Sequence, residues 1–415
     1  MIDRVEKPGP GPAVLLALLL SSTLAWAQDS GRFLPAGSLT TSRTSHTATL
    51  LNDGRVLVVG GRGVDSSHEL ASCELWDPAK KRFKPCAVLH TGRAGHTATL
   101  LDDGRVLVAG GTSAEGDRYL ALSSVELYDP KKDTWTEAAP MAQARNWHAA
   151  AKLPDGRVVV AGGAREQRSH LDSVEAYDPK TNKWSPLPPL KVARCLHSLL
   201  PFNGGLLAAG GRSNAVAVPS TEAPDGGSAQ RPHGSPARDK GFGVPIASSE
   251  VLAPNATAWA LAPDLVEPVQ RHAAAVMADG RAAVLGGTTG AMLTNYLELL
   301  SPDAGAWTVS DTNLNTQLAS ESVDVLPNGD LLVVGGEPNN AADSAVAQRL
   351  QLSNARWCFV GELKAPRKQH TATLLKDGKV LVVGGVSAGL PEASAELWEP
   401  REGACVPPPV PSLEW

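Results

Sequence analysis

The chain has 415 residues and a formal net charge of −5, and its 40 glycines and 32 prolines separate short apolar segments. The mild acidity and the lack of a basic stripe argue against nucleic acid as a partner. No Cys-x-x-Cys, His-x-His or His-Glu-x-x-His spacing occurs, so the sequence predicts no metal site and no cofactor.

The first 27 residues have the outline of a secretory signal peptide. Arg4 and Lys7 precede an apolar run at 13–20, and Ala25-Trp26-Ala27 offers the small residues that a signal peptidase requires. The run is too short to span a bilayer, and no later segment could do so. The cleavage point carries no cysteine for a lipid anchor. We therefore expect cleavage near Ala27 and a secreted protein: periplasmic, on the cell surface or extracellular.

Residues 28–405 are built from a repeat. A Gly-Gly pair that follows an apolar run occurs seven times, with steps of 50, 52, 48, 76, 49 and 49 residues between the first glycines. A fixed period near 50 residues indicates a repeat architecture. The pairs begin at Gly60, Gly110, Gly162, Gly210, Gly286, Gly335 and Gly384.

The second copy, residues 93–135, shows the whole unit. Four apolar segments of strand length, named a to d in chain order, are bounded by turn signals. Asp103-Gly104 lies between a and b, where a tight hairpin needs residues that tolerate positive φ. Strand c ends at Pro130, which cannot continue a ladder, and Trp135 opens strand d.

Strand b is apolar on both faces, as in Val56 to Val59. Such a strand is expected between two neighbouring sheets rather than at a solvated surface. The Gly-Gly pair then marks a place where backbone of the neighbouring unit comes too close for a side chain. Aromatic residues at one position of strand c are the expected neighbours of this pair and pack between the units. They are Trp76, Tyr128, Tyr177 and Trp398.

The order Arg-x-x-His, Asp-Gly, Gly-Gly, Glu-Leu-Tyr-Asp-Pro and Trp resembles the kelch repeat over roughly residues 33–405. This resemblance implies an all-β, seven-bladed kelch β-propeller with four antiparallel strands per blade. It also includes a distant similarity to the central propeller of galactose oxidase, a copper-radical enzyme whose site needs tyrosines, histidines and a Cys–Tyr cross-link. Only four tyrosines exist here, and Tyr128 and Tyr177 take core positions, so that activity carries over poorly.

The ends of the chain must meet to close the ring. Phe33 lies ten residues before Arg43, which is the spacing of strand d before the next unit, yet no unit precedes it. We therefore expect Phe33 to Leu39 to complete the last blade. In the alternative, the segment from Cys405 does so, ahead of a Pro-rich tail at 406–415.

Five cysteines allow two disulfides at most. If Trp76 pairs with Phe83 across the c–d turn, Cys73 lies opposite Cys86, within bridging distance in an oxidising compartment. The remaining cysteines have no assigned partner. They are Cys195, Cys358 and Cys405.

The variable b–c loops share one face with the d–a connections, and variable loops on a rigid scaffold usually carry binding. The longest is a flexible Pro/Gly/Ser-rich insertion at 212–247. The other loops bring cationic and aromatic candidates to the rim of the channel, which suit an acidic or carbohydrate ligand. These candidates are Arg62, Arg118, Tyr119, Arg165 and His170.

The start of strand a carries an Arg and a His in most units, and a residue that recurs in each blade normally makes the same local hydrogen bond in each. Breaks in the pattern carry more information. Trp147 and Arg271 occupy a slot next to the His that holds smaller or uncharged residues elsewhere, and Glu321 replaces the His in the sixth unit. We expect these three residues at the mouth of the channel, with Trp147 and Arg271 as ligand-binding residues and Glu321 as a weak catalytic candidate.

No catalytic constellation stands out, so the sequence favours a secreted, monomeric binding module that recognises a protein or glycan through its b–c loop face. The alternative is a carbohydrate-active oxidase, lyase or epimerase in which Glu321 is the acid/base and Arg271 clamps an anion. A third interpretation is a structural or adhesive role at the cell surface. The sequence does not separate this role from the first.

Overall fold

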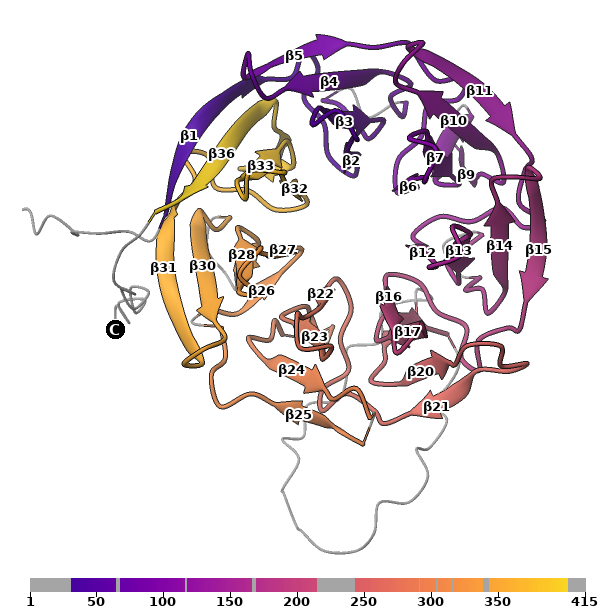
Figure 1. Cartoon of the computed structure of the whole chain (residues 1–415), viewed down its shortest axis with the longest axis vertical. Helices are drawn as coiled ribbons and strands as arrows, with labels where there is room; N and C mark the ends of the chain where they lie inside the picture. The colour runs from indigo at the N-terminus through magenta and orange to yellow at the C-terminus, as the bar shows by residue number, and fades with distance from the viewer. Residues whose placement is uncertain are drawn as a thin grey trace, which may run out of the picture.

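We describe a computed structural model of the chain. It covers residues 31–401 except 65–67, 116–117, 166–168, 215–242, 291, 304, 315 and 339–342. Within these residues the regular secondary structure is all strand, arranged as seven four-stranded antiparallel sheets in a ring around a central axis (Figure 1). This is the seven-bladed β-propeller expected from the repeat. The described residues contain no helix of the length and apolarity that a membrane span requires.

Each blade runs outward from strand a at the channel to strand d at the rim. Blade 1 is β2 (Thr47–Leu50), β3 (Val56–Val59), β4 (Cys73–Asp77) and β5 (Arg82–Pro85); blade 2 is β6 (Thr97–Leu100), β7 (Val106–Ala109), β10 (Val125–Asp129) and β11 (Thr134–Ala138). Blade 3 is β12 (Ala149–Lys152), β13 (Val158–Ala161), β14 (Val174–Asp178) and β15 (Lys183–Leu187); blade 4 is β16 (Ser198–Phe202), β17 (Gly205–Ala209), β20 (Ser249–Leu252) and β21 (Ala260–Ala262).

Blade 5 is β22 (Ala273–Val276), β23 (Ala282–Leu285), β24 (Leu297–Leu300) and β25 (Trp307–Val309); blade 6 is β27 (Ser322–Val325), β28 (Leu331–Val334), β30 (Val346–Gln351) and β31 (Arg356–Glu362). Blade 7 is β32 (Thr371–Leu374), β33 (Val380–Val383), β36 (Ser394–Pro400) and β1 (Gly31–Ser38). Short pairs extend from the loops: β8 (Thr112–Glu115) with β9 (Arg118–Ala121), β18 (Arg212–Ser213) with β19 (Val244–Pro245), β26 (Leu318–Ala319) with β29 (Glu337–Pro338), and β34 (Val386–Ser387) with β35 (Leu390–Pro391).

The N-terminal strand closes the ring. β1 pairs antiparallel with β36 and places Phe33 opposite Trp398, so the outer strand of blade 7 comes from the start of the chain (Figure 1). The strand begins two residues earlier and ends one residue earlier than the sequence predicts. The alternative segment at Cys405, the tail and the predicted signal peptide lie outside the described residues, as does most of the 212–247 insertion.

The core consists of seven apolar clusters, one in each interface between neighbouring blades. Strand b is fully buried in every blade, because its two faces pack against the blades on either side; Val56 to Val59 are 0% exposed. The aromatic residues of strands c and d lie in these interfaces, and Trp135 also donates its indole N–H to the Ala87 carbonyl of the preceding blade. The inter-blade packing expected of these aromatics is confirmed.

The Gly-Gly pairs have positive φ and permit close inter-blade contact. A Cβ on Gly60 would clash with the carbonyl of Arg93 and the imidazole of His96, both in the next blade. A Cβ on Gly61 would clash within its own blade, against Thr44 and His46. The first glycine therefore lies as close to the neighbouring blade as predicted, but the residues that it meets belong to the Arg-x-x-His segment. The prediction that the aromatic residues of strand c are the neighbours of this glycine is wrong, because they pack deeper in the interface.

A buried ion pair joins the start of strand a to strand c in five blades. In blade 4, Arg194 donates to the carbonyls of Gly210 and Ser248 and to Glu250 Oε1 at 2.8 Å, with both charged side chains 0% exposed. The Glu then accepts backbone N–H groups of the d–a connection, so the pair ties three segments together. The equivalent pairs are Arg43–Glu74, Arg93–Glu126, Arg145–Glu175 and Arg367–Glu396.

Blades 5 and 6 lack this pair. Val269 replaces the Arg in blade 5 and leaves Glu298 with only the N–H groups of Val266 and Glu267. Burial raises the pKa of Glu298 to about 7. In blade 6 both partners are replaced, by Leu318 and Gln348.

A disulfide joins Cys73 and Cys86 in blade 1, with a Cα–Cα distance of 5.4 Å. The register that led to this pair is confirmed, since Trp76 lies opposite Phe83. Cys358 is also disulfide-bonded, whereas Cys195 is a buried free thiol whose pKa burial raises to about 12.

Candidate functional site

The d–a connections and the b–c loops meet on one face, as the alternation of antiparallel strands requires. Thr44, which precedes strand a of blade 1, forms a β-bridge with Arg62 of the b–c loop, and Cys195 forms the same bridge with Arg212 in blade 4. The channel mouth on this face is therefore framed by two layers, the d–a connections inside and the b–c loops outside.

Seven residues with a left-handed backbone conformation surround the mouth in a ring, one in each blade. Each stands immediately before the recurring position at the start of strand a that holds His, or Glu321 in blade 6. Their φ values lie between 49° and 61°. Five backbone N–H groups of this ring donate to the ring residue of the preceding blade, as Leu196 does to Trp147 at 3.0 Å. We call this set the mouth ring: Ser45, Gly95, Trp147, Leu196, Arg271, Ser320 and Gln369.

The mouth ring explains why Trp147 and Arg271 stand out. A left-handed conformation costs a residue with a Cβ roughly 1 kcal/mol, and only glycine adopts it freely. The fold requires the conformation in all seven blades, but it does not require a large side chain there. Trp147 is nevertheless 38% exposed with its indole ring over Gly95, and Arg271 is exposed as well. These two side chains project at the mouth where the sequence predicted them.

The histidines of strand a form an inter-blade hydrogen-bond system. Each imidazole Nε2 meets the hydroxyl that follows the His of the preceding blade, as His96 meets Thr47 at 2.9 Å and His148 meets Thr97 at 3.0 Å. His46, His272 and His370 make the same contact with Thr371, Ser198 and Ser322. Burial lowers the pKa of every one of these histidines, so they are neutral structural groups rather than a ligand ring.

Two alanines interrupt this system. Ala149 and Ala273 stand where the other blades have Thr or Ser, so they offer no hydroxyl. The next blade then carries an orphaned group: His197 Nε2 after Ala149, and both carboxyl oxygens of Glu321 after Ala273. The two alanines directly follow the His of blades 3 and 5, which are the blades that present Trp147 and Arg271. The breaks in the repeat therefore cluster in blades 3 to 6.

The carboxyl of Glu321 packs against Gly286 and is shielded from solvent. Burial raises its pKa to about 8, while the backbone N–H groups of Glu321 and Ala273 act weakly in the opposite direction. The position at the open mouth that we expected for Glu321 is therefore not observed, because the side chain turns into the blade 5–blade 6 interface. A substrate would not reach this acid without movement of the ring.

Restoring the missing hydroxyl should stabilise the propeller. We expect Ala149→Thr to raise the free energy of unfolding by about 1 kcal/mol, because His197 Nε2 gains the partner that its sister histidines have. Urea denaturation at neutral pH measures the change. Ala149→Val, of the same shape without a hydroxyl, is the matched control, and equal stability of the two variants would contradict the hydrogen-bond explanation.

The b–c loops of blades 1 and 2 interlock. Arg62 pairs with the buried Glu69 at 3.0 Å and lies 4.5 Å from the ring centre of Tyr119. Glu69 also accepts the N–H of Ala114 and the hydroxyl of Thr112. Arg62 is thus charge-neutralised, which the sequence did not reveal because Glu69 was not recognised as its partner.

The other loop candidates lie apart from this pair. Arg118 is exposed in β9 beside Tyr119, and Arg165 is exposed in the b–c loop of blade 3. His170 packs beside Gly243 of the blade 4 loop, and burial, with a smaller contribution from Arg212, lowers its pKa. The structure therefore brings Arg62 and Tyr119 together, places Arg118 next to Tyr119 in β9 and leaves the others on separate loops.

A family model described as "KLHDC2/KLHL20/DRC7 Kelch-repeats domain" matches residues 16–211. This match covers just under half of the chain. The fold is a seven-bladed β-propeller whose first half is similar to a kelch-repeat domain. A comparison with curated protein sequences finds no match.

The fold was also compared with solved structures. One similar structure is a fungal alcohol oxidase of the AA5 family in complex with copper, with 17% sequence identity and a TM-score of 0.64; the alignment covers 89% of this chain and 75% of the oxidase. At this identity the similarity establishes the fold alone.

The residues of this propeller do not fit a copper centre. Within the described ranges, no three His, Cys, Asp or Glu side chains lie close enough together to hold a metal ion. The histidines of strand a are buried against hydroxyls, and Tyr128 and Tyr177 are 0% exposed in inter-blade clusters. We derive no copper chemistry from this fold.

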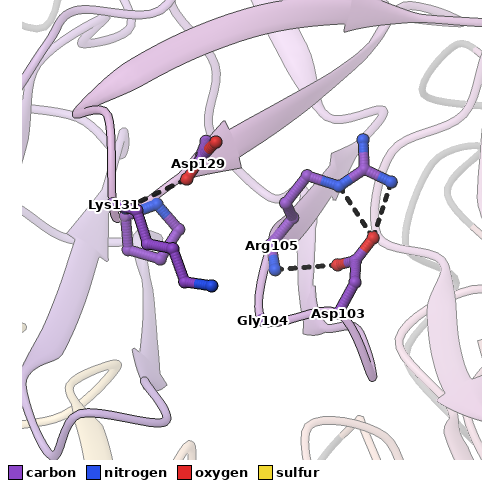
Figure 2. A pocket seen from close by; sticks show the side chains of 6 residues that line it. Asp103, Gly104, Arg105, Asp129 and Lys131 are labelled. Carbon is purple, nitrogen blue, oxygen red and sulfur yellow. Dashed lines mark hydrogen bonds and ion pairs between the residues drawn. The ribbon is translucent and has the colours of Figure 1, made fainter.

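The opposite face of the propeller carries the a–b and c–d turns. A hollow of about 150 Å³ lies there in blade 2, between Arg105 and Lys131 (Figure 2). Its charges are paired within the turns: Arg105 makes two hydrogen bonds to Asp103, and Asp129 accepts the N–H of Lys131. The same Asp-Gly-Arg pairing recurs in blades 1, 3 and 5, so we interpret this hollow as turn structure.

Proposed function

We propose that this protein is a secreted binding module that holds an acidic saccharide at the channel mouth of its loop face, between Trp147 and Arg271. The observation that carries the proposal is the mouth ring. Seven residues share a conformation that glycine adopts most easily, and two of them carry large exposed side chains. Bulky residues at strained positions are a reason to suspect function.

The chemistry of the two side chains defines the ligand. An exposed indole offers a flat apolar surface on which the C–H face of a sugar ring can pack. An exposed guanidinium binds a carboxylate through two parallel hydrogen bonds. Trp147 and Arg271 come from blades 3 and 5, on either side of blade 4, and the Trp147 indole lies over Gly95 of blade 2, so the proposed ligand must extend across Leu196 to touch both. A sugar ring that bears a carboxylate satisfies both groups.

Binding is favoured over catalysis by the position of Glu321. It is the acid nearest in sequence to the mouth ring of blade 6, and its carboxyl oxygens are shielded from solvent. A general acid or base must be within hydrogen-bond reach of the substrate. The exposed Arg118 and Arg165 remain on the outer loops, where they add positive charge to the rim.

The test uses variants that should leave the fold intact. Trp147→Gly and Arg271→Gly place the residue that tolerates positive φ best into the mouth ring, so we expect unchanged or slightly higher thermal stability. On an array of glycans and cell-wall polysaccharides, we expect saturable wild-type binding to acidic glycans and at least tenfold weaker binding by each variant. Gln369→Gly, in the same ring on blade 7, is the matched control and should bind as the wild type does.

Two outcomes would contradict the proposal. Binding confined to neutral glycans would remove the role of Arg271, and full binding by Trp147→Gly would move the ligand away from the mouth. If no glycan binds, a protein partner recovered from the native cell envelope becomes the stronger hypothesis for the loop face.

A further inference from the structure

The interfaces between blades share one packing position near the turn face. There, the residue that follows strand a of one blade meets the last apolar residue of strand c in the next blade. At six interfaces one of the two is an aromatic residue or a methionine, and both lie in the same cluster. The six pairs are Leu51–Tyr128, Leu101–Tyr177, Phe202–Leu300, Met277–Leu350, Leu326–Trp398 and Leu375–Trp76.

The interface between blades 3 and 4 breaks this rule. Its pair is Leu153 and Leu252, so the aromatic ring is missing and nothing replaces its volume. Blades 5 and 6 also carry Leu in strand c, but Phe202 and Met277 compensate from the preceding blade. Leu153 has no such compensation and is partly exposed, whereas its equivalents at the other interfaces are buried.

A pocket of about 310 Å³ occupies this place. It is lined by Leu153, Leu187 and Leu252 together with Arg157, Pro254 and Asn255. Protein interiors are close-packed, and the other six interfaces of this ring show how the space is normally filled. The pocket is therefore a local departure from the repeat on the turn face, away from the mouth ring.

Two sister blades show what fits such a space. The phenol ring of Tyr128 lies 5.0 Å from that of Trp135, and its hydroxyl donates to Asp133 at 2.8 Å. Tyr177 lies 5.2 Å from Trp184 and donates to Asn182 at 2.9 Å.

Blade 4 keeps the tryptophan and the arginine that flank that phenol but lacks the phenol itself, and Thr257 stands where its sisters have the hydroxyl acceptor. Trp259 takes the place of Trp135 and Trp184, and Arg157 takes the place of the arginines that flank the two tyrosines. Asn255, from a turn that differs from its sisters, lines the pocket and carries an amide. We propose that this pocket binds a small free phenol, with its ring against Leu153 and Leu252 and its hydroxyl at Asn255.

The experiment is a titration of the purified, ¹⁵N-labelled protein with p-cresol, followed by NMR at the indole N–H of Trp259. This N–H donates to the carbonyl of Pro188, which lines the pocket, so it reports locally. We expect a saturable shift with a dissociation constant on the order of 1 mM, as suits a ligand of this size. Toluene, which lacks the hydroxyl, should bind several-fold more weakly.

Leu252→Tyr should fill the pocket with the protein's own phenol, raise the melting temperature and weaken p-cresol binding at least tenfold. Leu300→Tyr is the matched control: Phe202 already fills that interface, so the variant should lose stability and keep p-cresol binding. If Leu252→Tyr does not fold, Asn255→Ala supplies the second test and should abolish the preference for p-cresol over toluene. Absence of a saturable shift, or binding by Leu252→Tyr equal to the wild type, would overturn the proposal.

Discussion

Lowering the pH from about 7.5 to about 5.5 should destabilise this propeller, because six buried histidines must stay neutral in the folded state. Burial lowers the pKa of His46, His148 and His370 to about 3 and that of His272 to about 4. It lowers the pKa of His96 and His197 well below the ordinary value. In the unfolded chain each imidazole takes up a proton near pH 6.5.

The sign of the effect follows from where the protons bind. Between about pH 6.5 and the folded pKa values, the unfolded chain holds the protons and the folded chain does not, so stability falls as the pH falls. One pH unit below 6.5 costs about 1.4 kcal/mol for each histidine, and six together cost roughly 8 kcal/mol. That is comparable to the whole stability of an ordinary domain.

Three carboxyl groups act in the opposite direction over part of this range. Burial raises the pKa of Glu298 to about 7, that of Glu321 to about 8 and that of Asp324 to about 6, so their destabilising charge is relieved as the pH falls toward the unfolded values of about 4. These three groups offset part of the cost of the six histidines. We therefore expect net proton uptake on unfolding at about pH 5.5.

Urea unfolding over a pH series measures this uptake through the slope of the unfolding free energy. His46→Gln should reduce the slope by about one proton, whereas His68→Gln, on an exposed loop, is the surface control. A stability that stays flat from about pH 7.5 to about pH 5.5 would show that the imidazoles are accessible to protons in the folded ring.

Much of the fold could be predicted from the sequence, because each blade repeats the same signals. The Gly-Gly pairs, the hairpin turns and the doubly apolar strand b determine a stack of sheets, and the spacing of Phe33 indicates how the ring closes. Because the repeat occurs seven times, its copies can be compared with one another within a single sequence, and a copy that differs from the others can be recognised.

The candidate site was harder to predict from the sequence, since its features depend on contacts between blades. Trp147 and Arg271 were visible as departures, but the positive φ that makes them unusual belongs to the backbone geometry of the mouth ring. The orphaned His197 depends on Ala149, about 50 residues earlier, and the sequence signals this only once the hydrogen-bond partner is known. The same holds for Arg62, whose pairing with Glu69 required the loop structure.

Removing the buried arginine of blade 4 should be among the most damaging single substitutions in the ring. We expect Arg194→Ala to lower the free energy of unfolding by about 3–5 kcal/mol, because it leaves the carboxylate of Glu250 and two carbonyl oxygens buried without their cation. Arg281→Ala, which breaks an ion pair on the exposed turn face, should cost under about 1 kcal/mol. Urea denaturation at about pH 8 compares the two.

Blades 5 and 6 show two natural outcomes of the same loss. Glu298 without its arginine has a raised pKa, so Glu250 in Arg194→Ala should behave likewise, and the cost of the substitution should shrink between about pH 8 and about pH 6 as that carboxyl gains a proton. Blade 6 replaces both partners, so Arg194→Leu combined with Glu250→Gln should recover part of the loss, since no buried charge remains. If the double variant were no more stable than Arg194→Ala, the damage would come from lost packing rather than from the orphaned carboxylate.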